Sequence, residues 1–306
     1  MHFTQKVRSY LTAGAALVLS SACAMQTNLP ITHAAGAVHS WMTPAAQSQN
    51  LLYVSDLGTN EVDVLSYPSG SPVGKLSGFG SVAGLCVDKA GDVFVVDEAG
   101  PVQVFAHGGT TPIRKLTVYG APYGCSADSL TGNLAVTNLS SYLYGAVAIY
   151  PKAKGAPNVI KSSEANSTYF CGYDPSGNLY VDGNDHSAAF VLWELPKGKT
   201  TLSDLHFTKQ ITKPGGVQWD GSYVAVGDYA AGLIYRTKRG SGVVAKTVTL
   251  KSGDDVQQFW IAGGTLVGQS LGEVPYWHYP GGGSPSKTLL GFSEPIAATV
   301  SVAKAQ

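Results

Sequence analysis

A short β-type run recurs six times along the 306-residue chain at a nearly constant spacing. Its clearest copy, residues 84–97, reads GLCVDKAGDVFVVD, which is an apolar strand, a tight turn and a second apolar strand. The second strands repeat in steps of 41 to 45 residues, and their central valines are Val54, Val95, Val136, Val181, Val226 and Val267. A period near 40 residues indicates that each unit is one supersecondary element that must stack on its neighbours.

Each repeat contains the signals of four strands. In four of the repeats the first strand ends in an Asp that is followed one to four residues later by Gly, as in the pair Asp88 and Gly91. That spacing suits a hairpin turn, because Asp bonds to its own backbone and Gly supplies a positive φ. A third strand follows the valine run, as in PVQVFAH, and a Gly/Pro-rich turn leads to a fourth, as in TTPIRKLTV. The sequence therefore predicts an all-β, six-bladed β-propeller of four-stranded antiparallel blades.

The two ends of the repeat region are incomplete in complementary ways. The first unit starts directly at the second-strand sequence LLYVSD, and the last segment, EPIAATVSVAK, has the pattern of a first strand with nothing after it. An open ring would leave exposed strand edges. We therefore expect the ring to be closed by the C-terminal strand, with residues 297–302 beside residues 51–55.

The N-terminus carries a targeting pattern. In residues 1–24, Lys6 and Arg8 precede an apolar run of about ten residues and the small residues SSACA, which is typical of a secretory signal peptide and too short to span a membrane. Cleavage after Ala24 would release a soluble chain that begins at Met25. Alternatively, Cys23 is the first residue of a lipoprotein and carries a lipid anchor.

Three regions follow from this pattern: the signal at 1–24, a flexible tether at 25–50 and the propeller at 51–306. Trp41 and Met42 are the sizeable apolar pair of the tether and can dock on the ring. We expect a monomer that is exported from the cytoplasm to the periplasm, the cell surface or the medium. The net charge is zero and no basic stripe is present, so no nucleic-acid partner is expected.

After Ala24 the chain keeps an odd number of cysteines, namely Cys86, Cys125 and Cys171. All three fall on first strands, where small apolar residues pack between blades. We expect three buried free thiols. The alternative is a disulfide between Cys86 and Cys125, because their opposite strand parity would let them face each other across one blade interface.

The stretch GLCVDKAGDVFVVDEAGPVQVF resembles the NHL repeat, and GNLAVTN with AVAIY and CGYDPSGNLYVDG with FVLWEL match it more loosely. The resemblance covers residues 51–302. It implies a six-bladed propeller of the NHL and gluconolactonase-like group, which includes binding scaffolds, metal-dependent lactonases and lyases. These motifs specify a fold and leave the function open.

Acidic residues are concentrated at one face of the expected ring. The loops that join second to third strands, and each fourth strand to the next blade, share that face. Twelve of the twenty acids fall on or beside it: Asp56, Glu61, Asp97, Glu98, Glu164, Asp182, Asp185, Asp228, Asp254, Asp255, Glu273 and Glu294. The opposite face collects Lys152, Lys154, Lys197, Lys199, Lys238 and Arg239. We expect a negative mouth that attracts cations.

Two interpretations of the repeated acids stay open. Asp97 and Asp228 end equivalent second strands, and Asp182 lies one position earlier in its blade. They can form a ring of oxygen ligands for a divalent cation such as Ca²⁺, or each can cap its own hairpin. Because they recur in nearly every blade, capping is favoured. The loop DGNDHS, which includes Asp185 and His186, breaks the repeat and is a second candidate for a metal.

Aromatic residues accompany these acids, with Tyr123 and Tyr169 at the same face. Such side chains stack on sugars or cationic groups, or pack between blades. The sequence thus predicts a binding module without a cofactor, whose partner is a protein, a peptide or a carbohydrate. Its ligand-binding residues would be Asp97, Asp182, Asp185, Asp228, Tyr123 and Tyr169. The alternative is a metal-dependent hydrolase or lyase of the lactonase-like type. The scattered histidines and the lack of a nucleophile motif favour the binding module over an enzyme.

Overall fold

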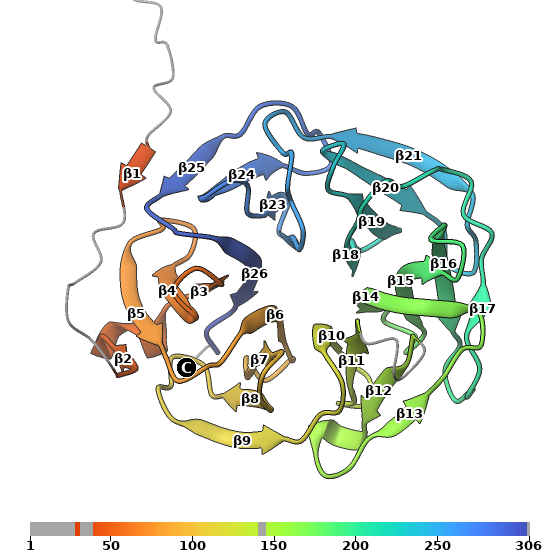
Figure 1. The fold of residues 1–306 in the computed structure, drawn as a ribbon. Coiled ribbons are helices and arrows are strands. Elements are labelled where there is room, and N and C mark those ends of the chain that lie inside the picture. The colour runs from red at the N-terminus through yellow and green to blue at the C-terminus, as the bar shows by residue number, and fades with distance from the viewer. Residues whose placement is uncertain (1–27, 31–38, 140–144, 305–306) are drawn as a thin grey trace, which may run out of the picture.

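Six β-sheets form a ring around a central axis (Figure 1). The computed structural model describes residues 28–30, 39–139 and 145–304. The expected signal peptide and the alternative lipid anchor at Cys23 lie outside the described residues. Each sheet is one blade, and the blades are numbered 1 to 6 in chain order.

Every blade contains four antiparallel strands, which follow one another from the axis outward. Blade 1 has β26 (Pro295–Ser301), β3 (Leu51–Asp56), β4 (Glu61–Ser66) and β5 (Pro72–Leu76). Blade 2 has β6 (Val82–Val87), β7 (Val93–Asp97), β8 (Val102–Phe105) and β9 (Pro112–Leu116). Blade 3 has β10 (Pro122–Ala127), β11 (Leu134–Asn138), β12 (Val147–Tyr150) and β13 (Asn158–Ile160).

The second half of the ring repeats this order. Blade 4 has β14 (Ala165–Tyr173), β15 (Leu179–Asp185), β16 (Phe190–Leu195) and β17 (Ser203–Asp204). Blade 5 has β18 (Pro214–Trp219), β19 (Val224–Asp228), β20 (Leu233–Thr237) and β21 (Val244–Thr249). Blade 6 has β22 (Trp260–Ala262), β23 (Thr265–Val267), β24 (Glu273–His278) and β25 (Lys287–Leu290). The prediction of a six-bladed, all-β propeller is confirmed.

The core consists of six apolar clusters, each of which lies between two neighbouring blades. A blade is therefore covered on both faces, so the side chains that point to either face of a strand are apolar. All six residues of β3 are buried for this reason, including Ser55 and Asp56. Burial on both faces explains why the second strands read as continuous apolar runs instead of alternating ones.

Ring closure follows the prediction as well. Strand β26 pairs antiparallel with β3, with Ala298 opposite Val54. In Figure 1 the C-terminal strand lies innermost in blade 1, beside the strand that opens the repeat region. All seven residues of β26 are buried. The composite blade removes the two edges that an open ring would expose.

Part of the segment expected to be a tether lies against the ring. Strand β2 (Trp41–Met42) pairs antiparallel with the outer strand β5, and β1 (Asn28–Pro30) pairs in parallel with β25. The 3-10 helix η1 (Pro44–Ser48) follows β2 and buries Ala46 in the cluster between blades 1 and 2. A second 3-10 helix, η3 (Pro151–Ala153), follows β12. Among the described residues, no helix is both long enough and apolar enough to cross a bilayer.

The cysteines differ from the expectation of three free thiols, which was wrong. Cys86 on β6 and Cys125 on β10 form a disulfide, with their Cα atoms 5.7 Å apart. The inner strands come this close because Gly84 lies against the backbone of residues 123 and 124, and a side chain there would collide with it. Cys171 is free and buried. Opposite strand parity, which supported the alternative, brought the two sulfur atoms together.

Candidate functional site

The two faces of the ring differ in the loops that they carry. The connection face carries the loops from each second strand to the third and from each fourth strand to the next blade. The turn face carries the remaining hairpin turns. Three of the predicted acids, Asp56, Asp97 and Asp228, bond to the backbone of blade-to-blade connections and so lie on the connection face. Asp97, for example, accepts hydrogen bonds from the N–H groups of Gly80 and Ser81 at 2.9 and 2.8 Å.

Most of these side chains have a structural partner. Besides the connection, Asp97 caps its own turn through the Ala99 N–H at 3.1 Å. Asp56 does the same with the N–H groups of Gly58, Ser293 and Glu294. Asn138 accepts from the Ala121 N–H at 3.2 Å. These residues therefore tie the start of a blade to the loop that follows a second strand.

Asp182 and Asp228 use one carboxylate oxygen each. Asp182 accepts from the Phe170 N–H at 2.7 Å, and Asp228 accepts from the Thr212 N–H at 3.3 Å. Their second oxygens are buried and have no hydrogen-bond partner among the described residues. Asp182 is fully buried, and this burial raises its pKa well above the ordinary value. A carboxyl group that solvent cannot reach is a poor ligand for a cation.

Asp185 lies in a different environment, at the end of β15 where the hairpin leaves the sheet. Its carboxylate accepts hydrogen bonds from the Ser187 N–H and hydroxyl and from the Ala189 N–H. The Ser187 and Ala189 bonds lower the pKa of Asp185, so the group is charged at neutral pH. His186 beside it is exposed, and its ring contacts the Ser163 carbonyl oxygen at 3.1 Å. The DGNDHS loop is thus a capped turn that presents one carboxylate.

Within residues 28–30, 39–139 and 145–304, no three His, Cys, Asp or Glu side chains lie together where they could hold one ion. The divalent cation considered from the sequence stays an untested prediction, as does the binding role of the six residues.

Aromatic residues from different blades meet at the connection-face end of the channel. The Tyr123 hydroxyl of blade 3 donates to Gln257 Oε1 of blade 6 at 2.8 Å, which joins opposite sides of the ring. The ring of Tyr169 meets that of Tyr123 edge-on, with centroids 6.3 Å apart. Burial raises the pKa of Tyr123, and the nearby carboxylate of Glu98 adds to the effect. We call Glu98, Tyr123, Tyr169 and Gln257 the mouth cluster.

Glu98 is the acidic member of the mouth cluster, and solvent can reach it. It is half-buried, and burial together with the neighbouring Asp97 raises its pKa. From the sequence, Glu98 is one of twelve acids on this face, with nothing to single it out. Only the tertiary structure distinguishes Glu98 from the other acids, because it brings this residue near Tyr123 of the next blade.

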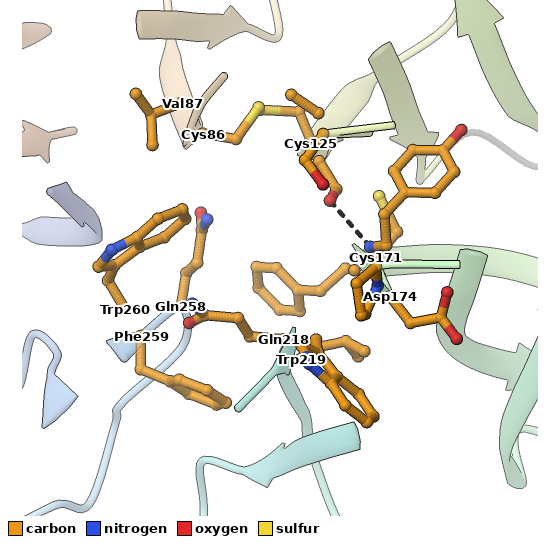
Figure 2. Close-up of a pocket in the computed structure, with 18 residues that line it drawn as sticks. Cys86, Val87, Cys125, Cys171, Asp174, Gln218, Trp219, Gln258, Phe259 and Trp260 are labelled. Carbon is orange, nitrogen blue, oxygen red and sulfur yellow. Dashed lines mark hydrogen bonds between the residues drawn. A yellow bond between two sulfur atoms is a disulfide. The ribbon is translucent and has the colours of Figure 1, made fainter. Parts of the chain in front are cut away.

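A second site lies at the other end of the channel. A cavity of about 220 Å³ opens between the inner strands toward the turn face (Figure 2). We call it the channel cavity. Its walls are Cys86, Val87, Cys125, Ser126, Ala127, Ser129, Phe170, Cys171, Gly172, Tyr173, Asp174, Pro175, Val217, Gln218, Trp219, Gln258, Phe259 and Trp260.

Two glutamines fix the walls of the channel cavity. Gln258 of blade 6 accepts from the Leu85 N–H and donates to the Leu85 carbonyl oxygen, which belong to blade 2. Gln218 of blade 5 makes the same pair of bonds with Ile261 of blade 6, at 2.7 and 3.2 Å. Each carboxamide therefore binds one residue of another blade in the manner of a strand neighbour. Figure 2 shows both side chains between the two labelled tryptophans.

Sequence reasoning missed this cavity. Cys125, Cys171, Val217 and Trp260 face equivalent valines of the second strands. Trp260 therefore stands where other blades have a small or medium side chain. Gln218 follows that position by one, where blade 4 has Gly172. A comparison of the repeats could therefore have found Trp260 and Gln218, because each departs from the residue type at the equivalent position of other blades.

Comparisons with known proteins show the fold and no family. No family model matches the sequence, and no curated protein matches it either. A chain in the crystal structure of a nidogen/laminin complex is similar, with a TM-score of 0.66 and 16% identity over 84% of this chain and all of that one. A protein of unknown function from Bacteroides caccae is similar too, with a TM-score of 0.63 and 13% identity over the same shares. These structural neighbours are propeller-like.

Proposed function

We propose that this chain is an exported binding module of the NHL and gluconolactonase-like propeller group, and that it takes its partner at the mouth cluster. The observation that carries the proposal is that the rings of Tyr123 and Tyr169, from neighbouring blades, meet at one end of the channel, where the charge of Glu98 from the preceding blade raises the pKa of Tyr123. Only the packing of blade on blade brings these residues together, and ligand sites in proteins are typically concave, aromatic and sparsely polar.

The chemistry of the mouth cluster favours a cationic group. Glu98 is half-buried and its pKa is raised, so its carboxylate lacks part of the hydration that it has in water. An ammonium or guanidinium group would replace that hydration, and the faces of tyrosine rings attract cations as well. The partner is thus a peptide or protein that presents a Lys or Arg side chain. The similar chain from the nidogen/laminin complex is a precedent for a propeller within a protein assembly.

The remaining parts of the proposal concern the cell. The sequence pattern of residues 1–24 supports export, to the periplasm, the cell surface or the medium. Cys23 offers a lipid anchor as the alternative to cleavage after Ala24. The module would act as a monomer.

A basic peptide tests the mouth cluster directly. The mature chain is titrated with a fluorescently labelled tetralysine peptide, and fluorescence polarisation is recorded at low and at high ionic strength. We expect binding that weakens with salt, because the attraction is screened beyond a Debye length of about 10 Å at 0.1 M. Glu98→Gln should weaken binding about three- to tenfold, in the range of one accessible charge pair.

The matched control is Glu164→Gln, which removes an exposed acid from the same face. It should change the affinity little. An equal loss in both variants would indicate a diffuse charge effect and count against a defined site, and an unchanged affinity in Glu98→Gln would refute the mouth cluster as the site.

A further inference from the structure

The channel cavity carries features that the mouth cluster does not explain. It lies on the turn face, it opens away from the connection-face acids, and its walls come from blades 2 to 6. Its volume of about 220 Å³ is below the roughly 300–1,000 Å³ of sites for drug-sized ligands. A guest of a single ring fits such a volume.

The walls combine aromatic surface with unused hydrogen-bonding groups. Trp219 and Trp260 both line the cavity and are partly exposed. Neither indole N–H donates a hydrogen bond to another residue within the described ranges. Solvent can reach both residues, so the two N–H groups are available to an acceptor that enters from outside.

The two glutamines add both donors and acceptors. A carboxamide can donate two hydrogen bonds and accept two. Gln218 and Gln258 each spend one donor and one acceptor on a backbone partner, which holds the carboxamide in a fixed orientation. Each keeps one N–H and one lone pair. A hydroxyl group, which donates and accepts at once, complements such a pair.

The charge of the walls is neutralised internally. Asp174 is the one carboxylate among the lining residues, and it accepts from the N–H groups of Ser176 and Asn178 and from the Asn178 amide. Arg239 lies 3.9 Å from Asp174, and its guanidinium stacks 5.0 Å from the centre of the Trp219 ring. This stacking fixes the indole, and no ionic group of the lining is left to pair with a charged guest.

From these observations we propose that the channel cavity is a binding site for a neutral pyranose, as a free sugar or as the end of a glycan. The C–H faces of the sugar pack on the tryptophan rings, because these faces are apolar. Its hydroxyls accept from the indole N–H groups and exchange donor and acceptor bonds with Gln218 and Gln258. The site is separate from the mouth cluster and does not depend on it.

Tryptophan fluorescence and calorimetry test the site with defined probes. Glucose, galactose and mannose are each titrated into the mature chain, beside their charged counterparts glucuronate and glucosamine. We expect saturable binding of at least one neutral sugar, with a Kd of about a millimolar or tighter, as the usual affinity per atom of a small ligand implies. Binding should be insensitive to salt, and the charged counterparts should bind about tenfold or more weakly.

Variants then locate the site. Trp219→Ala and Trp260→Ala should each weaken binding at least about tenfold. The milder Trp260→Phe keeps an aromatic side chain but is smaller and lacks the N–H, so it still reports on the site if the alanine variant does not fold. Trp41→Phe, on the outer strand β2, is the matched control and should leave affinity unchanged.

Several results would overturn the sugar site. The first is that no neutral sugar saturates the protein. The second is full affinity in both Trp219→Ala and Trp260→Phe. The third is salt-dependent binding of the charged sugars alone. Because Glu98→Gln should leave sugar affinity intact, failure here and failure at the mouth cluster are distinguishable.

Discussion

At the scale of single residues, burial separates acids that look equivalent in the sequence. Asp97 receives three backbone N–H groups, whereas Asp182 receives one and is fully buried. The pKa of Asp182 is raised well above its ordinary value by this burial. Between the unfolded pKa of about 3.9 and the raised folded pKa, the native state binds more protons, so stability falls as the pH rises. The contribution of this group to stability should be greatest below that window.

The variant Asp182→Asn tests whether Asp182 makes stability fall as the pH rises. Asparagine resembles the neutral acid, so the variant should be as stable as the parent below about pH 4 and more stable at neutral pH. Within the window, each pH unit lowers the free energy of unfolding of the parent by up to about 1.4 kcal/mol. Urea unfolding at several pH values measures both curves. Asp97→Asn is the matched comparison, and it should lose about 1–3 kcal/mol because one amide oxygen cannot serve three donors. A parent and an Asp182→Asn variant with parallel pH profiles would contradict the raised pKa.

At the scale of elements, the disulfide joins the inner strands of blades 2 and 3 rather than strands of one sheet. The two cysteines are separated by 39 positions, so the link closes a loop about one blade long in the unfolded chain. The chain-entropy account gives about 4 kcal/mol for a loop of this size. The double variant Cys86→Ala/Cys125→Ala should lose stability of that order in denaturant unfolding.

Chemical titration separates this prediction from a packing effect. The unfolded, non-reduced mature chain without Cys23 should show one reactive thiol, from Cys171. Burial raises the pKa of that thiol in the folded state, so native protein should react slowly. A reductant should destabilise the parent and leave the double variant unaffected. Three thiols in the non-reduced chain would disprove the bridge.

At the scale of the whole molecule, blade 1 is held by residues from both ends of the repeat region. Deleting residues 295–306 removes β26, exposes the edge of β3 and opens the ring. Because every residue of β26 is buried, we expect a loss comparable with the whole stability of a domain, about 5 kcal/mol or more. Thermal unfolding followed by circular dichroism should show a broad transition at much lower temperature.

The control is a shorter deletion that starts at Lys304, beyond the end of β26. It should melt close to the parent, because it leaves the pairing of β26 with β3 intact. If both truncations melted alike and cooperatively, the closing strand would have no role in holding the ring together.

The architecture could be predicted because its signals are local and repeated. The turn at Asp88 to Gly91 is encoded by two residues, and Asp88 does accept hydrogen bonds from the N–H groups of Ala90 and Asp92. Even the closing strand was predictable, since an incomplete first unit and an unpaired last strand complement each other. Asp97 does cap its own turn, as the favoured interpretation has it, and it also binds the connection that enters its blade.

The candidate sites could be predicted only in part. Tyr123 and Tyr169 do meet at the connection face, as their register suggested. Asp182 and Asp228 were grouped with them, but both are buried, and each has a backbone partner. Strand parity assigns a residue to a face of a blade. It gives neither the depth of burial nor the partner of each oxygen.

The sequence by itself determined the number of blades, their four-stranded pattern and the strand that closes the ring, because these depend on periodicity and on short-range turn chemistry. Tertiary structure alone decided which side chains meet across the axis. The inner strands approach closely where glycines allow it, so Cys86 reaches Cys125, and Gln258 reaches Leu85 from 173 positions away. Such contacts depend on the radius and tilt of the closed ring, which are set by the packing of all six blade interfaces together.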